Sequence, residues 1–506
     1  FYLNDPYLGH WPHHSAKKSK VAPIGFDNYT KFSTDLATHD LPFSISYAPE
    51  FFKSINQHGL VIGAEVGCGW FDPRVTVNPD TTLQLSMVSL IRDTKILAYY
   101  LLQDCLEHDG YQWLFQSPLD VEGKPTPRYE ILKKVGAFVE NHSSLLCQSE
   151  EVYSPIGIGI YMPQVRDMVR SNLNIWSVME DMNKGMIRFN GPPGVIGALT
   201  ECGYNPRVMD LEVMSYEEMK KLKVVFLFST GHLDNETYEK LLKYVYGGGV
   251  LITCGYPVTE NEVGEKFEKN VLFPAEPYSS SNITDFGTTN IFSQAGKDLV
   301  SYQVSRYQIK HKQSLHTIDM MQPFAEAIRY IGKMGAWIDT ERGKKLWISR
   351  FVSMWKAGSG ISPVLRYYDI PVGYSVRYGH GKSIFLGTLL GAFYDTPAFY
   401  SKDAKKKDSI VEFLSLILKE AGVRPLHNQI PNVEVVTRNM KEGMVVFLVN
   451  RGSEKEFSLE TDYQFYENAE LVFTSKGSTL DKKYFHEHHV LKGNIEKDDV
   501  MGIRIF

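Results

Sequence analysis

The chain has 506 residues, of which 43% are hydrophobic and 22% charged, and its formal net charge is −5. This balance is ordinary for a globular protein, and the lack of a long basic run argues against a nucleic-acid partner. No apolar run approaches the roughly 18 residues of a membrane span, so no membrane partner is expected. The five widely spaced cysteines, with no Cys-x-x-Cys pair, favour free thiols in a reducing compartment. We therefore expect a cytoplasmic protein without a bound metal or other cofactor.

The length exceeds what one hydrophobic core serves and indicates about three domains. In residues 1–147, apolar strand patterns alternate with helical patterns. Strands are expected at 21–29, 59–67 and 94–104, and helices at 79–93 and 126–146. Polar residues at the ends of such strands are typical of a (β/α)8 barrel.

Residues 148–427 repeat the strand–helix rhythm in the pattern of a doubly wound, flavodoxin-like α/β domain. An insertion is expected at about 258–375, with one helix at 322–334. The segment "YGHGKS" at 378–383 lacks the glycine at 376 that a phosphate loop requires, so a hairpin turn is favoured. Residues 428–506 alternate apolar and polar positions and predict a small antiparallel β domain. The predicted fold class is therefore α/β.

Glu65 is the first candidate for chemistry, because it ends the apolar run "VIGAE" at 61–65. A glutamate at the end of a barrel strand lies on the face where such enzymes react, as a nucleophile, a general base or a metal ligand. The alternative is a structural acid paired with Arg74 or Arg92.

Three segments together resemble the glycoside hydrolases of families 35 and 42, which are retaining β-galactosidases and their relatives. They are "GAEVGCGWFDPR" at 63–74, "AYYLLQD" at 98–104 and "DGYQWLFQSPLDVEGKPTPRYE" at 109–130. The segments "YVYGGGVLITCGYP" and "RYGHGKSIFLGTLLGAFY" resemble the amidotransferase-like second domain of these enzymes. The insertion and the β tail look most like archaeal exo-β-D-glucosaminidases.

The resemblance implies that Glu65 is the nucleophile of a two-carboxylate site. It implies that Trp70 stacks on the sugar, although a core indole is the alternative. The implied ligands of sugar hydroxyls are Asp27, Asn28 and Tyr29, although Asp-Asn is also a turn signal. Tyr99 or Tyr100 ends the last barrel strand, and one of the two, taken here as Tyr100, faces Glu65 or the sugar.

The acid/base partner of Glu65 is not expected within this chain. In the resembling family it follows the fourth barrel strand as an Asn-Glu or similar pair, and no such pair precedes Glu65. Glu50 is the only upstream glutamate, and it opens a helix. An eight-stranded barrel needs about 250 residues, so residues 1–147 supply about its last three strands. We therefore expect an N-terminal polypeptide that completes the barrel, on this or another chain.

The resemblance thus implies an exo-acting retaining glycosidase that cleaves short oligosaccharides. The expected substrate is a terminal β-D-glucosaminide, with β-D-galactoside as the alternative, and the expected assembly is a homo-oligomer. The competing hypothesis is a non-catalytic carbohydrate-binding or assembly subunit of a split glycosidase.

Overall fold

The computed structural model describes most of the chain outside the expected insertion. The described residues are 2–3, 25–28, 43–56, 59–69, 77–106, 110, 112, 115–161, 191–267, 270–273, 276–277, 290–294, 299–303, 306–309, 314–317, 328–329, 355–356, 362–367, 370–386, 411, 414–460 and 466–506. Contacts divide the chain into two compact units. Unit 1 comprises Phe1–Ser154, Leu199–Pro206 and Pro425–Phe506, and unit 2 comprises Pro155–Ala198 and Arg207–Arg424. No helix of these residues is long and apolar enough to span a membrane.

Unit 1 contains a parallel sheet of four strands in the order β1-β2-β3-β4. Its strands are β1 (Tyr2–Leu3), β2 (Gly25–Asn28), β3 (Val61–Gly67) and β4 (Thr94–Tyr100). The helices are η1 (Phe43–Ser46), α2 (Tyr47–Ile55), α3 (Pro79–Ile91) and α4 (Pro127–Cys147). The alternation of strand and helix agrees with the order expected from the sequence. Strand β1 was not expected.

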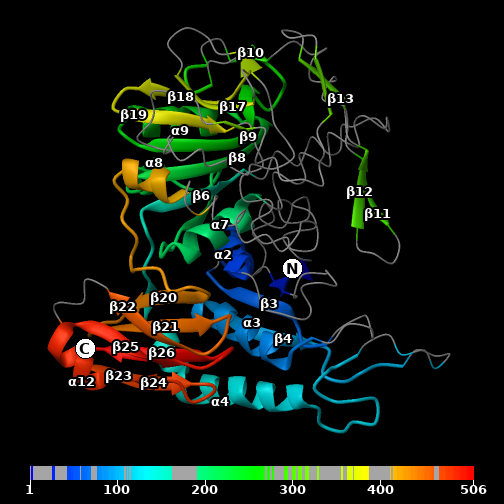
Figure 1. Cartoon of the computed structure of the whole chain (residues 1–506), viewed down its shortest axis with the longest axis vertical. Helices are drawn as coiled ribbons and strands as arrows, with labels where there is room; N and C mark the ends of the chain where they lie inside the picture. Colours follow the sequence, from blue (N-terminus) through cyan, green and yellow to red (C-terminus); the bar gives the residue numbers. More distant parts are fainter. Residues whose placement is uncertain are drawn as a thin grey trace. The chain divides into compact units, whose positions relative to one another are not determined.

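The helices of this sheet begin where the sequence supplies caps. The side chain of Asn78 accepts a hydrogen bond from the backbone of Asp80 at the start of α3, and Thr126 caps α4 in the same way. A proline follows each cap, at the position where a helix needs no backbone donor. α3 packs against β3, β4 and α4 (Figure 1).

The C-terminal part of unit 1 is antiparallel β structure. A five-stranded sheet has the order β23-β26-β21-β20-β5, and a three-stranded sheet has the order β22-β25-β24. The elements are β5 (Glu150–Glu151), β20 (Val433–Asn439), β21 (Met444–Asn450), β22 (Lys455–Glu460), β23 (Ala469–Thr474), β24 (Thr479–Leu480), α12 (Lys482–His488), β25 (Val490–Ile495) and β26 (Val500–Ile505).

This β structure shares a hydrophobic core with helices α3 and α4. The ring of Phe138 in α4 contacts Phe447 of β21 and Phe473 of β23 in edge-on geometry. Val445 and Val449 belong to the same buried cluster as the apolar residues of α3. The described contacts therefore group residues 428–506 with the N-terminal sheet, and the three-domain division at 147 and 427 stays a prediction.

Unit 2 is built on an eight-stranded sheet with the order β15-β17-β18-β19-β9-β8-β6-β7. The strands are β6 (Ile156–Ile160), β7 (Arg207–Asp210), β8 (Val224–His232), β9 (Val250–Glu260), β15 (Ile328–Arg329), β17 (Ser362–Tyr367), β18 (Ile370–Tyr378) and β19 (Gly381–Leu386). The five strands from β7 to β19 are parallel, in the order 2-1-3-4-5 of flavodoxin-like sheets. Its helices include α7 (Gly191–Glu201), which ends in unit 1, α8 (Tyr216–Met219) and α9 (Asn235–Tyr246).

The expected insertion contains short strand pairs and the antiparallel edge of the sheet. The pairs are β10 (Glu276–Pro277) with β16 (Trp355–Lys356), β11 (Asn290–Gln294) with β12 (Leu299–Gln303), and β13 (Arg306–Ile309) with β14 (Ser314–Thr317). The helix predicted at 322–334 is wrong at 328–329, because these residues form β15 and pair with β17. The remainder of that predicted helix lies outside the described residues.

Candidate active site

Three polar side chains come together where the parallel strands of unit 1 end. Asp27 of β2 is in register with Glu65 of β3, and Gly67 of β3 is in register with Tyr100 of β4. Since these strands are parallel, their carboxyl ends meet at one edge of the sheet. We call Asp27, Glu65 and Tyr100 the strand-end cluster.

The contacts of neighbouring residues show which face of the sheet these side chains occupy. Phe26 stacks on Phe52 of α2 with ring centroids 4.8 Å apart, so it faces the helices. Val66 belongs to the hydrophobic cluster formed with α3 and α4. The hydroxyl of Tyr99 donates to Ser86 of α3 at 3.0 Å. Because successive side chains of a strand alternate, the residue beside each of these points to the opposite face. That face holds all three members of the strand-end cluster.

The electrostatics of the cluster agree with this geometry. Burial, and then the negative charge of Glu65, raise the pKa of the Tyr100 hydroxyl. Tyr100 and Glu65 are half-buried, whereas Asp27 is only 3% exposed. A carboxylate that stays reachable beside a neutral phenol has the surroundings of a nucleophile or a base.

The other predicted site residues are placed differently. The side-chain amide of Asn28 donates to the hydroxyl of Ser89 in α3 at 3.1 Å, so it faces the helices and not the strand-end cluster. Trp70, Tyr29 and Arg74, the other arginine of the structural alternative, lie outside the described residues. Arg92, which the structural alternative would pair with Glu65, forms ion pairs with Glu151 and Glu434 instead, each at 2.8 Å.

Arg128 is a further residue near this edge, and sequence reasoning did not single it out. Its guanidinium donates to the carbonyl of Gln116 at 2.7 Å and to the carbonyl of Val77 at 2.9 Å. The backbone of Val77 also donates to the side chain of Gln116 at 2.9 Å. These bonds join the segment after β3 to the segment after β4. Burial lowers the pKa of Arg128 to about 10. Its place in "TPRYE", one residue after the helix-starting proline, was the available signal.

Within the described residues, no group of three or more His, Cys, Asp or Glu side chains is arranged to hold a metal ion.

Residues 177–271 match the family model described as GLMA-like, second domain. The exo-β-D-glucosaminidase of Pyrococcus horikoshii is 23% identical over 321 residues, which are 63% of this chain and 33% of that protein. The β-1,2-glucosyltransferase of Ignavibacterium album is 24% identical over 51% of this chain and 40% of that protein. The chain thus spans well under half the length of these curated relatives.

Solved structures resemble the whole chain. The β-galactosidase of Bacillus circulans sp. alkalophilus aligns with 100% of this chain and 63% of its own, with a TM-score of 0.65 and 14% identity. A catalytic mutant of Gan42B, a GH42 β-galactosidase from G. stearothermophilus, aligns with 97% of this chain and 60% of its own, with a TM-score of 0.61 and 13% identity. The chain is therefore homologous to exo-β-D-glucosaminidases and similar in fold to GH42 β-galactosidases, which are TIM-barrel proteins.

Proposed function

We propose that this chain is the carboxyl-terminal part of an exo-acting retaining β-glycosidase and that Glu65 is its nucleophile. The observation that carries the proposal is the strand-end cluster, in which Glu65 lies half-buried with Asp27 and Tyr100 on one face of a parallel sheet. The preferred substrate is a terminal β-D-glucosaminide, supported by the archaeal relatives, and the alternative is a β-D-galactoside, supported by the fold.

The proposed reaction has two steps. The Glu65 carboxylate attacks the anomeric carbon and forms a glycosyl-enzyme, while the bond to the leaving oxygen breaks and a second carboxylic acid protonates that oxygen. Water then attacks the same carbon and releases Glu65, with the second carboxylate accepting the water proton. Tyr100 donates its hydroxyl toward Glu65 or the sugar, and Asp27 accepts from a sugar hydroxyl.

The second carboxylate is assigned to barrel strands beyond the four described here. β4 is the last strand in the order of its sheet, and of the described strands only β3 pairs with it. Ile96, in the middle of β4, is 46% exposed, which is unusual for an apolar residue of a barrel strand. Both features support a further polypeptide segment that pairs with β4, covers Ile96 and brings the acid within about 5–5.5 Å of Glu65.

The test is the turnover of activated aryl β-D-glucosaminides and β-D-galactosides by the protein as isolated from its source. A dinitrophenolate leaving group needs no protonation, so the first step depends on Glu65 even where the acid is slow. We expect Glu65→Gln to lower turnover at least about 1,000-fold without changing the melting temperature. The matched control is Glu130→Gln, which removes an exposed carboxylate of α4.

Azide separates a nucleophile from a merely structural glutamate. In Glu65→Ala, azide ion is expected to occupy the vacated space, attack the anomeric carbon and restore aryl release with an α-glycosyl azide as product. Wild-type turnover in Glu65→Gln would overturn the assignment. Sugar binding by calorimetry without any turnover would favour a non-catalytic carbohydrate-binding subunit.

A second reaction class follows from the relative named a β-1,2-glucosyltransferase. A sugar hydroxyl in place of water releases the glycosyl group from Glu65 as a new disaccharide. Product analysis with and without an added sugar acceptor distinguishes transfer from hydrolysis, and Glu65→Gln abolishes both.

A further inference from the structure

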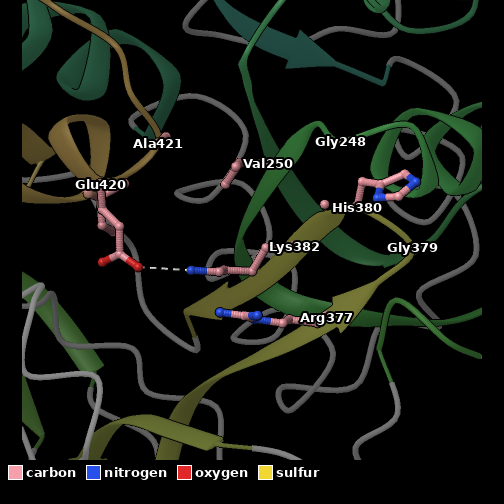
Figure 2. A pocket seen from close by; sticks show the side chains of 10 residues that line it. Gly248, Val250, Arg377, Gly379, His380, Lys382, Glu420 and Ala421 are labelled. Carbon is pink, nitrogen blue, oxygen red and sulfur yellow. Dashed lines mark hydrogen bonds and ion pairs between the residues drawn. The ribbon is translucent and has the colours of Figure 1, made fainter.

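Unit 2 contains a pocket of about 580 Å³ that the proposed glycosidase reaction does not use. It lies where β9 and β19 begin, beside the hairpin that joins β18 to β19 (Figure 2). Its described lining includes three basic side chains, Arg377, His380 and Lys382, and a single acidic one, Glu420. Pockets of about 300–1,000 Å³ are typical of sites for small molecules.

The two permanent cations of this pocket lie directly opposite each other. Arg377 of β18 is in register with Lys382 of β19. Figure 2 shows that both side chains extend toward the same side of the pocket. Like charges at opposed positions of an antiparallel pair are destabilising. Glu420 forms an ion pair with Lys382 at 2.9 Å, and it is the one carboxylate among the described residues of the lining.

The competing explanation is that these cations cap helix ends, where unpaired carbonyls attract positive charge. The backbone hydrogen bonds argue against this explanation, because backbone N–H groups already donate to these carbonyls. In α9, the carbonyl of Tyr246 accepts from the backbone of His380 at 3.0 Å, and that of Val245 accepts from Gly248 at 3.0 Å. In the helix that includes residues 414–420, the carbonyl of Ile417 accepts from the backbone of Ala421 at 3.0 Å.

The glycines of "YGHGKS" are explained by the packing of the hairpin against α9 and not by a ligand. A Cβ on Gly381 would lie 2.1 Å from the carbonyl oxygen of Val245, and one on Gly379 would lie 2.4 Å from that of Tyr246. These glycines allow the hairpin to approach the end of α9, so they do not form a phosphate loop. The hairpin turn expected from the sequence is confirmed, and any ligand must be held by side chains.

We propose that this pocket binds a small solute through a phosphate group held by Arg377 and Lys382. The planar fork of arginine matches two phosphate oxygens, and the lysine ammonium adds a point charge. A bound phosphate would place negative charge between these two opposed cations. The remaining volume suits a group the size of one sugar ring, with His380 at the rim.

The test is calorimetric titration of the isolated protein with inorganic phosphate and with glucose 6-phosphate at fixed ionic strength. We expect saturable binding of at least one of them, weakened 10-fold or more by Arg377→Ala and by Lys382→Met. The matched control Lys221→Ala removes an exposed lysine of the same unit and is expected to leave the affinity unchanged. Tighter binding of glucose 6-phosphate than of phosphate would assign the ligand as a phosphate ester, and equal binding would assign the free ion.

Glu420→Gln provides a test of opposite sign. Removing this carboxylate releases Lys382 from its ion pair and removes a repulsive charge, so phosphate affinity is expected to rise several-fold. A misfolded or loosened pocket would lower it. The proposal is overturned if neither phosphate compound binds, if Arg377→Ala binds as the wild type does, or if citrate binds as tightly as phosphate.

Discussion

Glu50 and Glu65 belong to successive elements of unit 1, α2 and β3, but their surroundings are opposite. Glu50 is 1% exposed and forms an ion pair with Lys53 at 2.7 Å, and the hydroxyl of Tyr153 lies 3.2 Å from each of its carboxylate oxygens. Glu65 is half-buried at a strand end, beside Asp27 and Tyr100. The comparison indicates that a carboxylate surrounded by cations serves the fold, whereas one left reachable at a strand end is available for chemistry.

The first of these regions is a network of charges formed by the half-buried Lys53 and the buried Glu50, Arg92, Glu151 and Glu434. Lys53 and Arg92 each contact Glu151, at 2.9 and 2.8 Å, and Arg92 also contacts Glu434 at 2.8 Å. The network joins α2 and α3 to β5 and β20, so it ties the N-terminal sheet to the C-terminal β structure. Buried ions stabilise a fold only while every partner is present.

Replacing Arg92 should produce the largest loss of stability. Arg92→Met fills a similar volume but leaves Glu434 and Glu151 without their shared cation. We expect the free energy of unfolding to fall by about 3–5 kcal/mol, measured by urea denaturation. The matched control is Lys133→Met, which breaks an exposed pair with Glu130 at 3.0 Å and should cost less than about 1 kcal/mol. Equal effects of the two substitutions would show that burial does not distinguish these ion pairs.

The adjacent tyrosines of β4 extend the comparison within one strand. Tyr100→Phe removes a hydroxyl from the strand-end cluster, and we expect turnover to fall about 10- to 100-fold with little change in stability. Tyr99→Phe removes the bond to Ser86 in α3, and we expect a loss of about 1 kcal/mol of stability with turnover unchanged. Turnover of an aryl β-glycoside and urea unfolding of both variants give four measurements. A loss of turnover in Tyr99→Phe alone would reverse the assigned orientation of β4.

The strand-end cluster was largely predictable from the sequence because it depends on local rules. An apolar run fixes where β3 lies, and the alternation of side chains leaves one of Tyr99 and Tyr100 on the inner face. The contact between Tyr99 and Ser86 decides the choice that the sequence left open. The same alternation turns Asn28 toward α3, which its place beside Asp27 and Tyr29 did not reveal.

The buried charge network was not predictable, because its partners are far apart in the sequence. Arg92 and Glu434 become neighbours only when the C-terminal strand β20 packs near α3. From the sequence, Arg92 was a candidate partner for Glu65, and nothing indicated Glu434. The helix predicted at 322–334 fails at Ile328 and Arg329 for a related reason, since pairing with β17 outweighs a local helical pattern.

The protonation of Glu50 gives the finest test of the comparison. Burial, and then the charge of Glu151, raise the pKa of Glu50 from 4.5 to about 7. Burial alone would also raise the pKa of Glu151, but the charges of Lys53 and Arg92 outweigh it and hold that pKa below its usual range. The folded protein therefore retains a proton on Glu50 at pH values where the unfolded chain has released it.

This difference in bound protons determines whether the free energy of unfolding rises or falls with pH. Between about pH 4.5 and pH 7 the folded state binds more protons at Glu50 than the unfolded state does, so its contribution to stability falls as the pH rises. Glu50→Gln cannot titrate, so its stability relative to the wild type should improve by about 2–3 kcal/mol across this window. Urea unfolding at pH 5, 6, 7 and 8 measures the difference, with Glu130→Gln as the exposed control. Parallel profiles of Glu50→Gln and the wild type would mean that Glu50 stays ionised throughout, and that Lys53 and Arg92 outweigh its burial.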